Sequence, residues 1–176
     1  VSTENGDDID ISKNSVFVQL GQKLTVLVVE DNYDMRKYIS SILSDYYKIE
    51  EAENGKEALD ILKSKSIDFI ISDLMMPVMD GLELSQKVKA DFSISHIPFL
   101  MLTAKTSLET QISSYKIGVD EFLAKPFDEE LLLTRISNIL ETRKNYQRKF
   151  SFKMDAEELN IVEESADERF LRKALE

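Results

Sequence analysis

Residues 70–81 read IISDLMMPVMDG. The stretch begins like a buried strand, reaches a carboxylate at Asp73, and continues into a loop that contains Pro77 and the pair Asp80-Gly81. A charged group at the end of a buried strand is costly unless a neighbouring group compensates for it. The surrounding sequence is therefore expected to supply such a group.

Strand-like and helix-like segments alternate five times around this stretch. Short apolar runs predict strands at 24–29, 47–52, 67–72, 97–103 and 119–124. Apolar residues at helical spacing predict a helix after each strand.

The first predicted helix has Asn32 as its cap and an apolar stripe of Met35, Tyr38, Ile39, Ile42 and Leu43. The second follows a turn at Asn54-Gly55 and has an inner face of Ala58, Leu59, Ile61 and Leu62. The others are predicted at 82–90, at 108–118 with Gly118 as a left-handed cap, and around Leu132, Ile136, Ile139 and Leu140. This alternation predicts an α/β domain, with a parallel sheet covered by helices on both faces.

Chemically reactive residues follow four of the five predicted strands. They are Glu30 and Asp31 after the first strand, Asp73 after the third, Thr103 at the end of the fourth and Lys125 after the fifth. Each alone has an ordinary explanation as a helix cap, a strand end or a surface residue. The carboxyl ends of parallel strands meet at one edge of the sheet, so together they predict a site there.

Clustered carboxylates repel one another unless a cation is present. An all-oxygen ligand set suits Mg²⁺, whereas zinc is disfavoured in a chain with no cysteine and one histidine. A divalent metal, a lysine and a hydroxyl beside a nucleophilic carboxylate form an arrangement suited to phosphoryl transfer.

Four motifs carry a family resemblance. VLVVEDN (26–32), DLMMPVMDG (73–81), MLTA (101–104) and DEFLAKPF (120–127) occur in the order found in receiver domains of two-component response regulators. The resemblance covers 24–141 and implies a flavodoxin-like (βα)5 fold, with a doubly wound sheet of five parallel strands.

The resemblance also implies a role for each residue of the predicted site. Asp73 would accept the phosphoryl group, and Glu30, Asp31, Asp73 and the backbone carbonyl of Met75 would hold Mg²⁺. Lys125, before a cis proline at Pro126, would contact the phosphate. Thr103 would be the switch hydroxyl and Phe122 the switch aromatic. Lys105 would either overhang the site and control access of water to the acyl phosphate, or be an ordinary solvated lysine.

The implied output is a change of surface. Phosphate would draw Thr103 inward, Phe122 would follow, and the face made by the helix at 108–118, the strand at 119–124 and the last helix would change. That face is also a candidate surface for a homodimer. His96 lies at the opposite end of the sheet in a predicted loop, so the phosphoryl group should come from a histidine kinase, in trans or in the same chain.

Composition limits the other partners. The formal net charge is −11, and residues 24–141 carry 12 basic and 21 acidic side chains. Such a surface repels phosphates, so the main domain is not expected to bind DNA by itself. The basic stretch 142–153 is interpreted as a solvated helix end and linker. No apolar run is long enough for a membrane span, so this part of the protein should not contact the membrane.

The two ends of the sequence suggest that the chain is a segment of a longer protein, because it starts at Val1 and stops inside a helical pattern. Residues 1–23 are interpreted as a linker, 24–141 as the receiver, 142–160 as a helix extension and linker, and 161–176 as the start of an output-domain helix. SADERFLRKALE (165–176) resembles the segment that opens AraC-type DNA-binding domains in hybrid two-component proteins. In such a hybrid the receiver would lie in the cytoplasm, attached to an inner-membrane kinase, and DNA would be bound only by the further domain. The alternative is a helix of another output domain.

Two other functions remain open at this stage. A phosphatase of the haloacid dehalogenase type also forms an aspartyl phosphate, but its second aspartate would fall at Met75. A receiver fold could also serve as a docking module that needs no phosphate. The resemblance to receiver domains implies a switch that catalyses its own phosphorylation and dephosphorylation but is not a conventional turnover enzyme.

Overall fold

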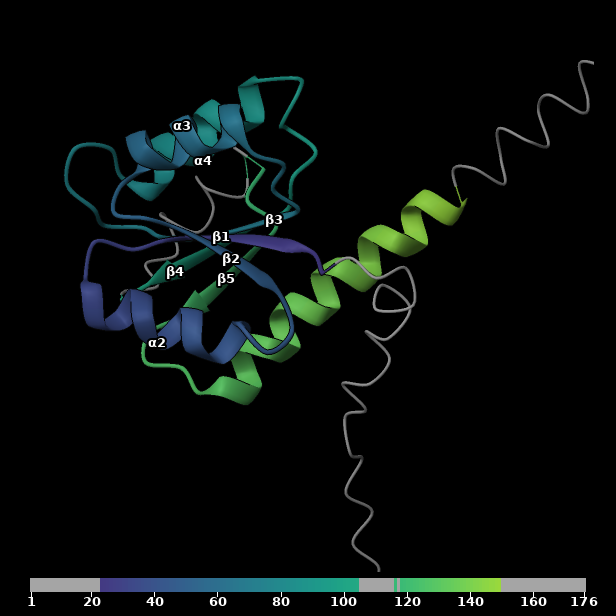
Figure 1. The fold of residues 1–176 in the computed structure, drawn as a ribbon. Coiled ribbons are helices and arrows are strands. Elements are labelled where there is room, and N and C mark those ends of the chain that lie inside the picture. The colour runs from purple at the N-terminus through teal and green to yellow at the C-terminus, as the bar shows by residue number, and fades with distance from the viewer. Residues whose placement is uncertain (1–22, 105–115, 117, 150–176) are drawn as a thin grey trace, which may run out of the picture. The chain divides into compact units, whose positions relative to one another are not determined.

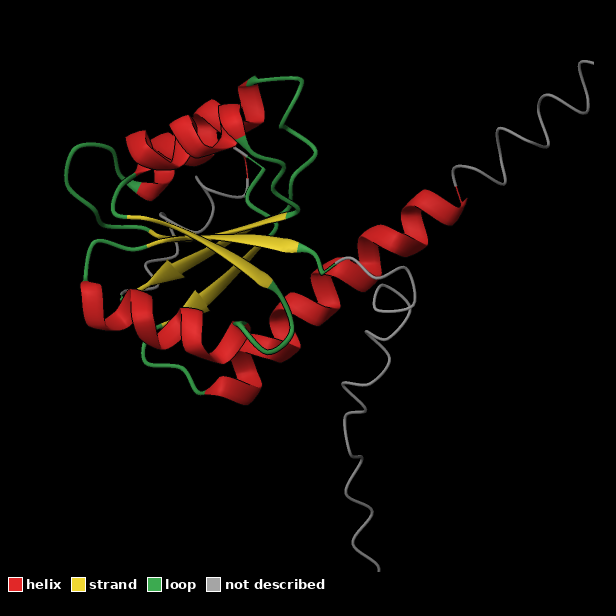
Figure 2. Ribbon diagram, in the orientation of Figure 1, coloured by secondary structure: helices red, strands yellow, loops and turns green. Residues whose placement is uncertain are grey.

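A single five-stranded sheet forms the centre of the domain (Figures 1 and 2). The computed structural model describes residues 23–104, 116 and 118–149. The strand order is β2-β1-β3-β4-β5, and every neighbouring pair is parallel. The strands are β1 (Thr25–Val29), β2 (Lys48–Ala52), β3 (Phe69–Asp73), β4 (Phe99–Thr103) and β5 (Glu121–Ala124). The predicted doubly wound parallel α/β fold is confirmed.

Helices lie on both faces of this sheet. α3 (Gly55–Ser64) and α4 (Gly81–Ala90) cover one face, while α2 (Tyr33–Leu43) and the start of a helix over residues 129–149 lie on the other (Figure 2). Asn32, Asn54 and Asp80 cap the first three of these helices, and Asp128 accepts a hydrogen bond from the backbone N–H of Leu131 at the start of the last. A side-chain oxygen at each of these positions satisfies a donor that the helix itself leaves unpaired.

The last helix continues through residue 149, which confirms that the segment after Leu140 extends it. A boundary between two compact units falls within this helix, between Ser137 and Asn138. None of the helices in the described part of the chain is long and apolar enough to cross a bilayer. The predicted helix at 108–118 lies mostly outside the described residues, but Gly118 has the expected positive φ, at 100°.

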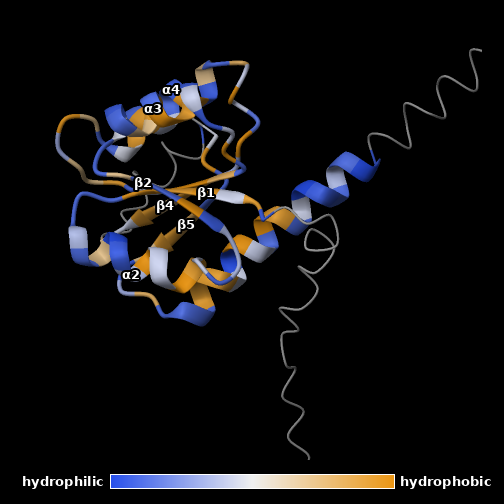
Figure 3. Cartoon of the chain, viewed as in Figure 1, coloured by the Kyte–Doolittle hydropathy of each residue, from blue (hydrophilic) through white to orange (hydrophobic). Residues whose placement is uncertain are grey.

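The central strands are buried along their whole length. All residues of β3 and β4 are buried, and only Thr25 of β1 is partly exposed. The strands are correspondingly apolar, as Figure 3 shows by their orange colour. Continuous apolar strands are expected where helices cover both faces of a parallel sheet. Such a sheet is a rigid support for groups placed at its edge.

Two details of the helix predictions are wrong. Asn54-Gly55 is not a separate turn: Asn54 caps α3 and Gly55 is its first residue. In α2 the predicted Ile39, Ile42 and Leu43 are buried, but Arg36 and Ser40 are buried as well, while Tyr38 is 44% exposed. Arg36 can be buried because its guanidinium finds a carbonyl and two carboxylates as partners.

The loop after β3 is closely packed and locally strained. A Cβ at Gly81 would collide with the carbonyl oxygen of Asp73, so only glycine allows the helix to start there. Val78 has φ 70°, and the backbone N–H of Met79 donates to the carbonyl of Pro77 at 2.8 Å. This geometry is a classic γ-turn, which is rare and strained for a β-branched residue. The loop is therefore held in one shape beside Asp73.

Candidate phosphoryl-transfer site

Three carboxylates meet at the carboxyl-terminal edge of the sheet. Glu30 and Asp31 directly follow β1, and Asp73 is the last residue of β3, the strand beside β1. One carboxylate oxygen of each lies within 4.8 Å of the others. Glu30 is 1% exposed and Asp73 8% exposed, whereas Asp31 is exposed. The sheet therefore brings together the three acidic residues that the sequence placed at strand ends.

Lys125 supplies the compensating charge for the two buried carboxylates. Its Nζ lies 2.6 Å from Glu30 Oε2 and 2.8 Å from Asp73 Oδ1. Burial alone would lower the pKa of the Lys125 ammonium, but its hydrogen bonds to Asp73 and Glu30 outweigh this effect and raise the pKa. The ammonium is therefore held charged between the ends of β1 and β3.

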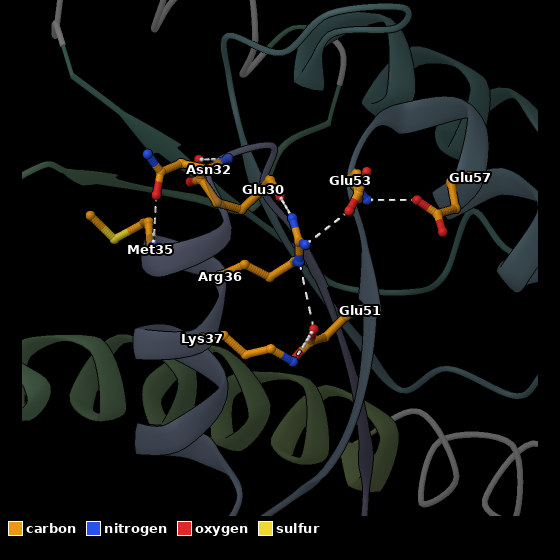
Figure 4. Close-up of polar contacts among 8 residues, drawn as sticks. All are labelled: Glu30, Asn32, Met35, Arg36, Lys37, Glu51, Glu53 and Glu57. Atoms are coloured by element: carbon orange, nitrogen blue, oxygen red, sulfur yellow. Dashed lines mark hydrogen bonds and ion pairs between the residues drawn. The ribbon is translucent and has the colours of Figure 1, made fainter.

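Every polar group of Glu30 has a hydrogen-bond partner, and Figure 4 shows two of these partners, Asn32 and Arg36. Its backbone N–H donates to the carbonyl of Ala52, and its own carbonyl accepts from Arg36 Nη1 at 2.6 Å. Its Oε1 accepts from the backbone N–H of Asn32 and its Oε2 from Lys125. Burial raises the pKa of the Glu30 carboxyl, and the hydrogen bond from Lys125 offsets only part of the rise. Glu30 is thus a rigid member of the cluster.

The remaining predicted site residues differ in their burial, and one of them lies outside the described part. Thr103 ends β4 at 3% exposure, and its carbonyl accepts the backbone N–H of Lys125 at 2.8 Å. The peptide between Lys125 and Pro126 is cis, as predicted. Met75 is 73% exposed, and Phe122 is 8% exposed within the apolar core. Lys105 lies outside the described residues.

An open hollow of about 450 Å³ adjoins the cluster. It is lined by Glu30, Asn32, Asp34, Met35, Tyr38 and Lys125. Tyr38 also stacks on Phe127, with ring centroids 6.5 Å apart. Met35 and Tyr38 belong to the predicted apolar stripe, so the sequence did not indicate that they line a surface hollow. The apolar spacing on α2 gave no signal for it, because i, i+3, i+4, i+7 and i+8 is the ordinary pattern of one buried helix face.

The donor set fits a hard divalent cation. Its atoms are carboxylate oxygens from three residues, and one of the three, Asp31, is exposed to solvent, so water can complete the coordination. Mg²⁺ prefers this combination of few protein ligands and several waters. The structure therefore supplies an acidic cluster with the chemistry of a magnesium site.

The sequence resembles known signalling proteins. The model of the family described as "Response regulator receiver domain" matches residues 26–137. Histidine kinase P4 of Formosa agariphila is 41% identical over 153 residues, which are 87% of this chain and 11% of that protein. Hybrid signal transduction histidine kinase D of Dictyostelium discoideum is 37% identical over 125 residues, 71% of this chain and 8% of that protein. The chain thus spans about a tenth of the length of these kinases.

Smaller relatives match over nearly their whole length. Chemotaxis protein CheY-3 of Vibrio cholerae is 33% identical over 124 residues, 69% of this chain and 95% of that protein. The solved structure of chemotaxis protein CheY4 of Vibrio cholerae superimposes with a TM-score of 0.64 at 37% identity, over 66% of this chain and 98% of that one. A CheY-like receiver from Methanospirillum hungatei gives a TM-score of 0.67 at 25% identity, over 71% and 99%. Sequence and fold agree, and the chain belongs to the response regulator receiver domain family.

Proposed function

We propose that this domain is a signalling switch that accepts a phosphoryl group on Asp73. The observation that carries the proposal is the ion-paired cluster at the sheet edge, where Lys125 contacts both Asp73 and Glu30. Asp73 ends a fully buried strand, so its carboxylate is fixed in place. A fixed carboxylate beside an ammonium is arranged for attack on a phosphorus atom.

The transfer step uses this chain's own groups. An oxygen of Asp73 attacks the phosphorus of a phosphohistidine, so that an O–P bond forms while the P–N bond breaks. The electron pair of that bond stays on the imidazole nitrogen, which takes up a proton. Lys125 moves from the carboxylate to the incoming phosphoryl oxygens and neutralises their charge. Hydrolysis of the acyl phosphate later returns Asp73 to its starting state.

The acidic cluster would hold the metal that this transfer requires. Glu30, Asp31 and Asp73 offer carboxylate oxygens, and the backbone carbonyl of Met75 is the fourth protein ligand in the proposal. Bound Mg²⁺ would neutralise negative charge on the phosphoryl oxygens. Asp31 is the exposed member of the cluster, so without the metal its side chain is the one that neighbouring residues hold least firmly in position.

The proposed output begins at Thr103. Its hydroxyl would bond the phosphoryl group, and Phe122 would respond on the neighbouring strand, where it pairs with Met101. Phe122 is already buried in this structure, so phosphorylation would stabilise an orientation that the fold accommodates. The surface that would change includes the predicted helix at 108–118, which lies mostly outside the described residues. A homodimer through this face belongs to the same proposal.

The wider protein is also part of the proposal. The two kinases described above contain a matching segment, which supports a donor histidine kinase for this chain, in trans or in the same polypeptide. In the hybrid arrangement, residues 1–23 are a linker, residues 142–160 are a helix extension and linker, and residues 161–176 begin an output domain, of the AraC type or another. Control of transcription and DNA binding would belong to that domain. The receiver would then lie in the cytoplasm.

Phosphorylation by a small phosphodonor tests the proposal. We expect acetyl phosphate with Mg²⁺ to add one phosphoryl group, observed by intact-protein mass spectrometry, and to add none to Asp73→Asn. Asp80→Asn is the matched control, because Asp80 only caps α4 and asparagine caps equally well. Absence of an adduct in the wild type would favour a docking module. Rapid turnover of phosphomonoesters would favour the phosphatase.

Lys105 is tested in the same assay. If its side chain controls the access of water, Lys105→Ala should change the half-life of the phosphorylated protein after the donor is removed. An equal half-life in the two proteins would remove this role and leave Lys105 as a solvated lysine.

A further inference from the structure

Arg36 is a buried cation that the transfer chemistry does not use. Its side chain is 6% exposed, although it belongs to a helix at the surface of the domain. Nη1 donates to the carbonyl oxygen of Glu30 at 2.6 Å, and Nη2 donates to Glu53 Oε1 at 3.0 Å. Nε lies 3.5 Å from Glu51 Oε2. Figure 4 shows the guanidinium between the end of β1 and the end of β2.

The carbonyl that Arg36 binds belongs to the peptide that joins Glu30 to Asp31. The direction of this carbonyl sets the plane of the peptide, and the plane sets where the Cα and the carboxylate of Asp31 begin. Glu30 has other supports, since Asn32 and Lys125 hold its carboxylate. The hydrogen bond from Arg36 is therefore the contact that bears most directly on Asp31.

Charge alone does not account for this placement. The carboxylates of Glu51 and Glu53 balance the guanidinium from the side of β2. A cation next to a metal site opposes the binding of a second cation. A purely electrostatic Arg36 would therefore weaken the affinity of the acidic cluster for Mg²⁺, and its removal would strengthen it.

We propose that Arg36 is a positioning residue, which orients the Glu30–Asp31 peptide and thereby increases the affinity of the acidic cluster for Mg²⁺. The inference rests on the proposed function, because it concerns the same metal site. The proposal predicts that loss of the guanidinium weakens Mg²⁺ binding, whereas electrostatics alone predicts that it strengthens binding. Groups that hold metal ligands from outside contribute about 10- to 100-fold to metal affinity.

The test is a Mg²⁺ titration of the unphosphorylated full chain by isothermal calorimetry. We expect Arg36→Met, which keeps the volume of the aliphatic stem but loses every donor, to raise the Kd for Mg²⁺ by about tenfold. Arg36→Lys keeps the charge but cannot bridge Glu30 and Glu53 in the same way, and should give a smaller rise. Lys37→Met is the matched control: it removes an equal charge and an ion pair to Glu51, but Lys37 has no contact with Glu30 among the interactions described. Its Kd should be unchanged or slightly lower.

A second measurement separates positioning from stability. The amide resonance of Asp31 in a ¹H–¹⁵N spectrum reports on the carbonyl of the preceding peptide, and it should shift in the metal-free Arg36 variants but not in Lys37→Met. A Kd for folded Arg36→Met equal to or below the wild-type value would overturn the proposal. If Arg36→Met does not unfold cooperatively, the test rests on Arg36→Lys. An unchanged Kd for Mg²⁺ in Arg36→Lys would then overturn the proposal. A wild-type protein that binds no Mg²⁺ would instead refute the metal site of the proposed function itself.

Discussion

Replacement of Lys125 by methionine tests how the buried cluster is stabilised. In the wild type, the Lys125 side chain, 17% exposed, contacts the carboxylates of Glu30 and Asp73, whose side chains are 2% and 11% exposed. Lys125→Met keeps the length and the apolar volume of the side chain but leaves Glu30 and Asp73 without their cation. Both carboxylates then remain buried next to each other.

The expected cost follows from these distances and from burial. With an effective dielectric constant of about 20, an ion pair at this separation contributes about 6 kcal/mol before desolvation is subtracted. After desolvation, removal of one partner of a buried pair costs about 3–5 kcal/mol. We therefore expect Lys125→Met to lower the free energy of unfolding by about 3 kcal/mol in metal-free buffer. For a domain of this size, the melting temperature should fall by roughly 10–20 °C.

Urea unfolding at pH 7 in EDTA, with circular dichroism as the signal, measures this difference. Lys65→Met is the control, because Lys65 Nζ lies at the same 2.6 Å from Glu50 Oε2 but its side chain is 51% exposed. An exposed ion pair contributes about 0–1 kcal/mol. If the two variants lose equal stability, the reasoning from burial is refuted. Mg²⁺ should restore part of the stability of Lys125→Met, because the metal can neutralise the same carboxylates.

Three further predictions concern the site and its surroundings. In EDTA, Asp31→Asn should melt a few degrees higher than wild type, because it removes one of three carboxylates within 4.8 Å, and Mg²⁺ should no longer raise its melting temperature in a thermal-shift assay. Gly81→Ala should lose about 1–3 kcal/mol in urea unfolding, because its Cβ meets the carbonyl of Asp73; wild-type stability would contradict this. Burial acts to raise the pKa of Glu51, but Lys37 and Arg36 outweigh it and the pKa lies below its ordinary 4.5. Ionised Glu51 thus stabilises the fold above pH 4.5, and this contribution is lost as the pH falls through the folded-state pKa. Glu51→Gln should be less stable than wild type by up to about 1 kcal/mol at neutral pH, with a gap that closes in acid unfolding experiments.

The strands were predictable because their environment is uniform. Helices cover both faces, so β1, β3 and β4 have continuous apolar sequences, and each was predicted within two residues of its observed bounds at both ends. β2 differs from these strands because it is not continuously apolar. It is an edge strand of sequence KIEEA, and three of its five residues are partly exposed. Its two glutamates, Glu50 and Glu51, form ion pairs with lysines instead of packing in a core.

The side of α2 that faces the sheet was predicted only in part: Ile39, Ile42 and Leu43 are buried as expected. The apolar pattern suggested Met35 and Tyr38 as core residues, whereas Arg36 is buried and Tyr38 lines a surface hollow. Arg36 lies three residues before Ile39, on the same helical face. A periodicity argument assigns arginine to solvent, because the carboxylates that make its burial possible lie in β2 (Glu51) and directly after it (Glu53).

The members of the candidate site were predictable, but their contacts were not. A parallel sheet puts all its strand ends at one edge, which is why Glu30, Asp73 and Lys125 could be grouped from their positions alone. That Lys125 bridges the other two, and that Asn32 and Arg36 hold Glu30, depends on side-chain directions set by the packed fold.

The ion pair between Lys125 and Glu30 joins residues 95 positions apart in the chain. These two residues lie near opposite ends of the domain sequence, and the strands that they follow, β1 and β5, are separated by β3 and β4 within the sheet. A nascent or truncated chain that lacks β5 therefore contains Asp73 but not the cation beside it. The proposed transfer of a phosphoryl group to Asp73 should therefore become possible only when the last strand has joined the sheet, and incomplete chains should not be phosphorylated.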